Sequence, residues 1–144
     1  MSAAANTALP PFMPGIFRLD PDGAAELIGS HCTPCARSQF PAATLCPACL
    51  APTQARSLGA HGHVYTYTVV RTKPPLGLPA PYAVGYVDLV GCDLRVFALL
   101  DAAEPERLRI GAPVRLQVAA LGHDGHGNAC LRPLFSPQPD REDP

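Results

Sequence analysis

Two C-x-x-C pairs are the part of this sequence best suited to chemistry. The pairs are Cys32 with Cys35 and Cys46 with Cys49, and ten residues separate them. Two such turns facing each other supply the tetrahedral shell of four thiolates that Zn²⁺ accepts in closed structural sites. Each pair also holds a proline, whose ring fixes φ and restrains the turn. The pattern predicts a zinc ribbon in which the metal supports the fold, because a closed shell leaves no position for a catalytic water.

Redox activity and disulfide formation are the alternative uses of these cysteines. A redox C-x-x-C normally stands alone near a βαβ pattern. Disulfides belong to oxidising compartments, and no signal for secretion is seen. His31, beside Cys32, could replace a ligand, although we interpret it as a polar neighbour. The remaining cysteines, Cys92 and Cys130, lie in apolar strand-like runs and are expected to behave as small buried hydrophobes.

Length and composition limit the possible classes of protein. The chain has 144 residues, 47% of them hydrophobic, and a formal net charge of −1, which fits one average domain or two small ones. No charged region is followed by an apolar signal segment, and no apolar run approaches the ~18 residues that span a bilayer. We therefore expect a cytoplasmic protein with no membrane partner.

The electrostatics of the sequence argue against nucleic acid as a partner. Binding to phosphates requires clustered Lys and Arg, whereas here 11 positive and 12 negative residues are dispersed. The close basic pair Arg71 and Lys73 flanks Tyr65, Tyr67 and Tyr82, which is the one arrangement compatible with base stacking. A single-stranded nucleic-acid-binding module is therefore kept as an alternative from another class.

The elements that must position the cysteines are predicted to be strands. Runs rich in β-branched and aromatic residues are separated by turn residues, and a short helix is compatible with 102–109. The fold class is mostly β, with an N-terminal four-cysteine zinc ribbon followed by a small OB-like five-stranded barrel. The expected parts are an N-terminal arm (1–16), the ribbon (17–52), the OB-fold domain (56–136) and a C-terminal tail (137–144). Strands are expected at 24–30, 36–40, 63–71, 82–90, 93–100, 114–118 and 129–135.

Motifs of a stand-alone enzyme are missing from the sequence. There is no G-x-S-x-G and no H-E-x-x-H. Asp88 is a lone acid in a strand and is interpreted as an acceptor for backbone amides. His123 and His126 lie in a glycine-rich turn and are interpreted as solvated. We expect no catalytic residue in this chain, and its proline-rich apolar loops indicate a partner.

The order of motifs resembles the domain-of-unknown-function-35 family, which is described as acyl-CoA-associated proteins with a zinc ribbon and an OB-fold. The motifs are GSHCTPC with the later FP and CPAC (29–49), GHVYTYTVV (62–70), APYAVGYVDL (80–89) and RLRIGAPV (107–114). The resemblance covers about residues 17–135. One departure is Ala36, where relatives often have glycine, and it leaves the metal ligands intact.

The resemblance implies a non-catalytic small subunit of an acyl-CoA thiolase complex. The expected partner is a thiolase-like catalytic subunit that performs thiolytic or Claisen-type chemistry, for example on an aromatic or steroid β-oxidation intermediate. This chain would help to shape the channel for a coenzyme A thioester shared with that partner. A MaoC-like enoyl-CoA hydratase is the alternative partner. CoA phosphates require Arg or Lys, so Arg37, Arg71 and Lys73 are candidate contacts, and Tyr82 is a candidate for the pantetheine arm or the partner.

Overall fold

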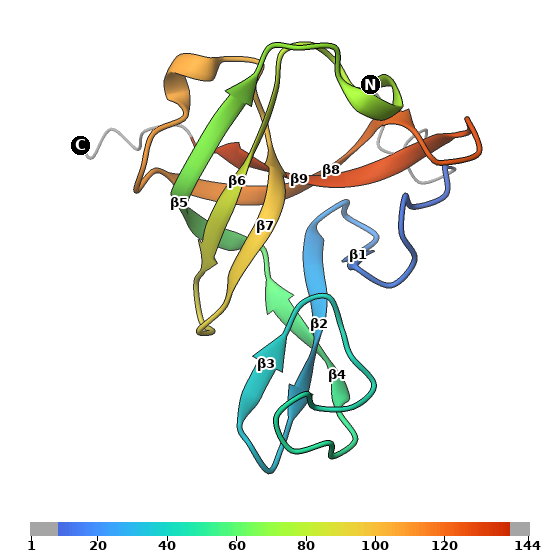
Figure 1. Ribbon diagram of the computed structural model, residues 1–144, viewed down its shortest axis with the longest axis vertical. Coiled ribbons are helices and arrows are strands. Elements are labelled where there is room, and N and C mark those ends of the chain that lie inside the picture. Colours follow the sequence, from blue (N-terminus) through green and yellow to red (C-terminus); the bar gives the residue numbers. More distant parts are fainter. Residues whose placement is uncertain (1–8, 139–144) are drawn as a thin grey trace.

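The computed structural model describes residues 9–138 and contains strands joined by turns and two short 3₁₀ helices (Figure 1). The outer parts of the predicted arm and tail, 1–8 and 139–144, lie outside the described residues. The strands are β1 (Phe17–Leu19), β2 (Ala25–Cys32), β3 (Arg37–Gln39), β4 (Gln54–Gly59), β5 (His61–Val70), β6 (Tyr82–Leu89), β7 (Arg95–Leu100), β8 (Pro113–His123) and β9 (Ala129–Pro137). The 3₁₀ helices are η1 (Pro75–Gly77) and η2 (Pro105–Arg107).

A small antiparallel sheet forms the lower part of the molecule in Figure 1, and β2 is its central strand. β4 pairs with one edge of β2, while β1 and β3 share the other edge. β2 and β3 lie where strands were predicted, whereas no strand was predicted at β1 or β4. β4 has no alternation of apolar and polar residues that would predict a strand, because Leu58 is its one buried side chain. Its pairing places residues 54–59 in the ribbon sheet.

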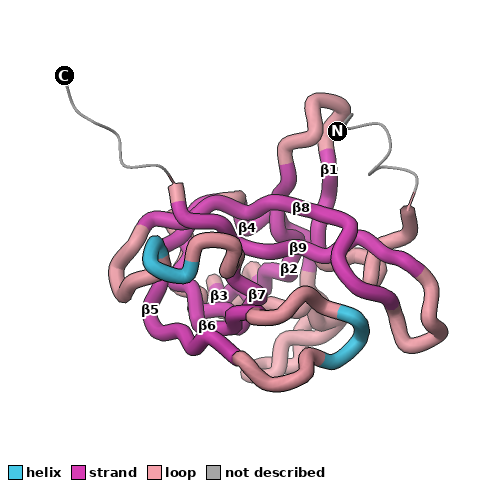
Figure 2. The backbone as a smooth tube through the Cα atoms, turned by 90° about the horizontal axis from the view of Figure 1, so that it is seen from above, coloured by secondary structure: helices cyan, strands magenta, loops and turns pink. Residues whose placement is uncertain are grey.

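The remaining strands close into a five-stranded barrel in the order β5-β6-β7-β9-β8 (Figure 2). Antiparallel pairing of β8 with β5 completes the ring, with Gly62 opposite Val114. β7 and β9 run parallel and share a single pair, Leu100 with Phe135. The mostly β fold class, with a zinc ribbon followed by an OB-like barrel, is therefore confirmed.

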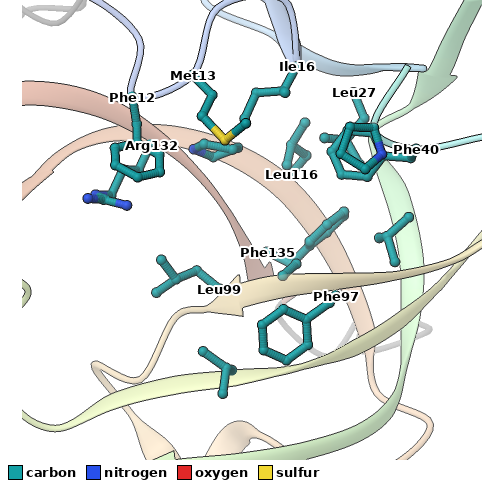
Figure 3. Close-up of a pocket in the computed structure, with 15 residues that line it drawn as sticks. Phe12, Met13, Ile16, Leu27, Phe40, Phe97, Leu99, Leu116, Arg132 and Phe135 are labelled. Atoms are coloured by element: carbon teal, nitrogen blue, oxygen red, sulfur yellow. The ribbon is translucent and has the colours of Figure 1, made fainter. Parts of the chain in front are cut away.

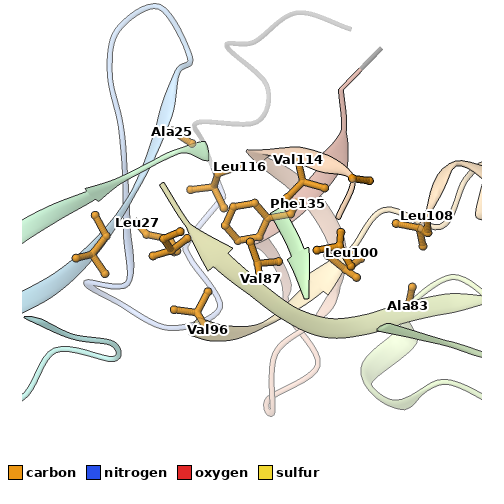
Figure 4. Packing of buried hydrophobic residues seen from close by; sticks show 14 residues of the cluster. Ala25, Leu27, Ala83, Val87, Val96, Leu100, Leu108, Val114, Leu116 and Phe135 are labelled. Atoms are coloured by element: carbon orange, nitrogen blue, oxygen red, sulfur yellow. The ribbon is translucent and has the colours of Figure 1, made fainter. Parts of the chain in front are cut away.

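The hydrophobic core fills the barrel and continues into the ribbon (Figure 4). Phe135 and Leu100 are among its largest fully buried side chains. Ala25 and Leu27 of β2 and Leu58 of β4 belong to the same cluster of buried residues. The ribbon is consequently more than a metal-bound appendage, because its strands β2 and β4 contribute side chains to the core of the barrel.

The structure decides three further sequence predictions, which concern the helix near 102–109, the two remaining cysteines and the N-terminal arm. The predicted helix around 102–109 is the single 3₁₀ turn η2. Cys130 is fully buried as expected, whereas Cys92 is only partly buried and lies in the β6–β7 turn, between the strands predicted at 82–90 and 93–100. Part of the N-terminal arm docks on its own chain, because the Phe12 amide donates to the Leu131 carbonyl at 2.8 Å.

Candidate metal centre and exposed surfaces

The four predicted cysteine ligands converge on one point at the far end of the ribbon. Their Sγ atoms all lie within 4.8 Å of one another, and those of Cys32 and Cys49 are 3.5 Å apart. Zn–S bonds of ~2.3 Å in a tetrahedron require sulfur–sulfur separations of roughly 3.8 Å. The residues present therefore fit a zinc ion held by four thiolates. His31 lies outside this set, since its Nδ1 is 3.2 Å from Ser38 Oγ and 3.0 Å from Arg56 Nη1.

Backbone amides prepare one of the sulfurs for a cation. The amides of Cys49 and Ala48 donate to the Cys46 sulfur and lower its pKa to about 7. The pKa of Cys35 is instead raised to about 12, chiefly by its hydrogen bond with the Cys49 sulfur and then by burial. Thiols packed this closely resist simultaneous ionisation, and a bound divalent cation removes that conflict by replacing the protons.

Each metal-binding turn ends on a residue with left-handed backbone. Ala36, after Cys35, has φ of 53°, and Leu50, after Cys49, has φ of 62°. This conformation reverses the direction of the chain after each cysteine pair. Residues other than glycine are disfavoured in it. The departure from the family pattern at Ala36 thus falls at a position where glycine is physically preferred.

We expect the substitution Ala36→Gly to stabilise the protein. Removing Cβ relieves a left-handed strain of about 1 kcal/mol, and part of that gain is offset because glycine adds entropy to the unfolded chain. The net increase in the free energy of unfolding is about 0.5 kcal/mol, measured by urea denaturation with zinc present. Ala42→Gly is the control and should not stabilise, because Ala42 lies in the loop after β3 and is not among the residues with positive φ. Equal effects of both substitutions would contradict the role of φ at Ala36.

An aromatic surface covers the outside of β5, β6 and β7, and we call Tyr65, Tyr86 and Phe97 the aromatic face. These side chains are 43–59% exposed. The Tyr86 and Phe97 rings meet edge to face with centroids 5.4 Å apart, and the Arg95 guanidinium lies 3.3 Å from the Tyr65 ring centroid.

An ion pair anchors the charged end of this surface. Arg95 Nε is 2.6 Å from an oxygen of Asp88 on the paired strand, and its hydrogen bond lowers the pKa of the Asp88 carboxyl. The interpretation of Asp88 as an acceptor for backbone amides was therefore wrong, because its carboxylate pairs with a side chain. The alternation of R-V-F in β7 was the signal that could have revealed this surface.

The predicted CoA contacts do not come together in one place. Arg37 lines a polar cleft of about 530 Å³ with His31 and Arg56, between the ribbon and the β6–β7 turn. Arg71 and Lys73 lie in the loop after β5, at the end of the barrel farthest from the ribbon (Figure 1). Tyr82 begins β6 beside that loop and is partly buried.

Comparison with known proteins identifies both modules. Residues 22–53 match the model for the "ChsH2, rubredoxin-like zinc ribbon domain", and residues 55–119 match the model for the "ChsH2, C-terminal OB-fold domain". A DUF35 domain-containing scaffold protein of Methanocaldococcus jannaschii is 31% identical over 102 residues, which cover 69% of this chain and 72% of that protein. The chain belongs to the DUF35 family.

Two further relatives of this DUF35 chain are parts of enzyme complexes. The benzoylsuccinyl-CoA thiolase subunit BbsA of Thauera aromatica is 30% identical over 118 residues, covering 81% of this chain and 80% of that subunit. The solved structure of the Ltp2–ChsH2(DUF35) aldolase matches with a TM-score of 0.62 and 27% identity, over 78% of this chain and 84% of that one. Within residues 9–138, no helix has the length and apolar character needed to cross a membrane.

Proposed function

We propose that this protein is the non-catalytic small subunit of a thiolase-like enzyme that acts on an acyl-CoA thioester. The observation that carries the proposal is the similarity to a benzoylsuccinyl-CoA thiolase subunit over 81% of the chain. The match to a DUF35 chain in an aldolase complex supports the same class of assembly. The reaction we expect is thiolytic or Claisen-type cleavage, for example of an aromatic or steroid β-oxidation intermediate.

The chemistry of the described residues supports a non-catalytic role, which we call the helper role. Among residues 9–138, the group of side chains arranged to hold a metal is the four-cysteine set, whose shell is closed and leaves no place for a substrate. The carboxylate of Asp88, the lone acid of strand β6, forms an ion pair with Arg95. The nucleophile and the groups that stabilise the transition state are accordingly assigned to the partner.

The aromatic face is our candidate docking surface for that partner. Tyr, Phe and Arg are enriched in the buried centres of protein interfaces, and Tyr86, Phe97 and Arg95 supply them on one rigid sheet. Rigid strands lose little conformational entropy on binding. We place the CoA phosphates near Arg37 or near Arg71 with Lys73, and Tyr82 beside the latter pair, so that the subunit lines one side of the channel.

Co-expression with a thiolase-like chain from the same host tests this function. We expect the two chains to purify as one complex, and cleavage of the acyl-CoA to require both. Tyr86→Ala and Phe97→Ala should each weaken the complex by about 10–100-fold, as interface hot spots do. Ile110→Ala is the matched control, because Ile110 is also exposed, at 72%, but lies off this face and should leave the complex unchanged.

Two results would count against the proposal. Activity of the thiolase-like chain that is independent of this protein would remove the helper role. A stable complex with an enoyl-CoA hydratase in place of the thiolase would move the assignment to the alternative partner.

A further inference from the structure

One edge of β7 is almost entirely unpaired within the part of the chain that the structure describes. Opposite residues in an antiparallel pair alternate between hydrogen-bonded and non-hydrogen-bonded positions. The Leu89 amide donates to the Leu94 carbonyl at 2.9 Å, so Val96 and Ala98 also bond toward β6 in the register observed. The backbone groups of Arg95 and Phe97 therefore point to the opposite edge of β7.

The next strand of the barrel leaves most of that edge open. β7 meets β9 at the single pair Leu100 with Phe135, and the Asp101 amide donates to the Phe135 carbonyl at 2.8 Å. Beyond this point the strands separate, and within residues 9–138 no backbone partner reaches Arg95 or Phe97 on this side. The corresponding edge of β9 is occupied by the arm, since the Leu131 amide donates to the Pro10 carbonyl.

An apolar groove of about 420 Å³ lies along the open edge (Figure 3). β7 forms one wall with Phe97 and Leu99, while Phe12 and Met13 of the arm lie on the other side. Phe40 of the ribbon closes one end (Figure 3). The groove joins the aromatic face, because Phe97 belongs to both.

Among the described residues, Arg132 is the one charged side chain that lines the groove, and its hydrogen-bonding groups are already occupied. Arg132 is 5% exposed and donates to the carbonyls of Leu121 and His123 at 3.1 and 2.9 Å. Its guanidinium also stacks on the Phe12 ring at 3.7 Å. The groove therefore offers an anion no free partner, and it favours an uncharged, apolar occupant.

We propose that an extended segment of the catalytic partner adds to the open edge of β7 as an extra strand and buries apolar side chains in this groove. The alternating N–H and C=O groups of Arg95 and Phe97 are complementary to an extended peptide backbone. The walls accept side chains such as leucine or valine, which point to one face at every second residue. The identity of the partner rests on the proposed function, whereas the existence of the site at the β7 edge does not depend on it.

Proline at position 97 tests the backbone contact. The Phe97 amide faces away from β6, so proline there keeps the β6 pairing and removes the outward donor. Phe97→Ala is the matched control, because both variants lose the ring and only Phe97→Pro loses the N–H. We expect Phe97→Pro to bind the co-expressed partner about tenfold more weakly than Phe97→Ala, with thermal unfolding midpoints that agree closely.

Amide exchange followed by NMR gives a readout in the unmodified chain. The Arg95 and Phe97 amides should exchange rapidly in the free protein and become protected in the complex, while Val96 and Ala98 stay protected throughout. A short capped peptide alternating threonine with leucine or valine serves as a partner-independent probe. It should shift the β7 amide resonances, and the same peptide N-methylated along one edge should not.

The outcomes separate this inference from the proposed function. A stable thiolase-like complex that leaves the Arg95 and Phe97 amides unprotected overturns the strand addition and leaves the helper role intact. If no such complex forms, the proposed function fails, and the strand-addition site is then tested by the peptide alone. Binding of the peptide at β7 supports the site, and absence of binding overturns it. Protection of the same amides by self-association overturns the assignment to a partner, because the occupant is then a second copy.

Discussion

Replacing Cys46 with alanine is expected to yield a protein without stoichiometric zinc and with a strongly reduced free energy of unfolding. Cys46 is fully buried, and its sulfur receives backbone hydrogen bonds that favour the thiolate. Structural zinc in ribbon-like peptides contributes about 10–16 kcal/mol of apparent binding free energy at neutral pH, and removing one of four ligands forfeits most of it. Metal content by mass spectrometry and urea denaturation measure the two effects.

The loss is expected to spread beyond the metal site. Leu27 and Leu58 of the ribbon pack in the barrel core, and each buried leucine contributes about 1.5–3 kcal/mol. If the ribbon unfolds, the barrel therefore loses several kcal/mol and exposes apolar surface to water. Chelation of zinc from the unaltered protein should reproduce both results, seen as increased binding of a hydrophobic dye.

Cys92→Ala is the matched control for this experiment. Cys92 lies in the β6–β7 turn, outside the four-cysteine set, so its removal should leave zinc content and stability nearly unchanged. A zinc-free Cys46→Ala protein with undiminished stability would contradict the coupling between ribbon and barrel. Full zinc content in that variant would contradict the assigned ligand set.

Phe135→Ala is expected to cost about 3–5 kcal/mol of folding free energy, which corresponds to a fall of about 10–20 °C in Tm. Phe135 is 1% exposed and forms the only pair between β7 and β9 within the described residues. Its ring packs with Leu100 and Leu116 where the barrel closes (Figure 4). Truncation leaves a cavity at that closure, and differential scanning calorimetry measures the loss.

A second phenylalanine on the neighbouring strand provides the comparison. Phe97 is 59% exposed, so Phe97→Ala should change Tm far less than Phe135→Ala. Similar losses from the two substitutions would show that the closure at Phe135 does not support the barrel.

Local patterns were sufficient for the metal centre and for most strands. The spacing of Cys32, Cys35, Cys46 and Cys49 predicted the cluster, because ligand geometry within one C-x-x-C turn is set by neighbouring residues. β5 and β6 were predicted for the same kind of reason, since alternation along a strand reports which face is buried. β4 was missed because its pairing with β2, rather than its own composition, makes it a strand.

The candidate CoA contacts show the limit of such reasoning. Arg37 and the pair Arg71 and Lys73 are equally plausible phosphate contacts in the sequence, where nothing measures the distance between them. In the fold Arg37 lies in the ribbon, whereas Arg71 and Lys73 lie at the end of the barrel farthest from the ribbon (Figure 1). The polar cleft at Arg37 also depends on Arg56 and the β6–β7 turn, which are far from it along the chain.

By itself the sequence determined the four-thiolate site, the mostly β class and the order ribbon then barrel, because these follow from spacings and periodicities within single segments. Tertiary structure alone decided that the ribbon shares its core with the barrel, that Tyr65, Tyr86 and Phe97 form one face, and that β7 keeps an open edge. The physical reason is that these features arise from pairing and packing between distant segments, whose free energies no local pattern records.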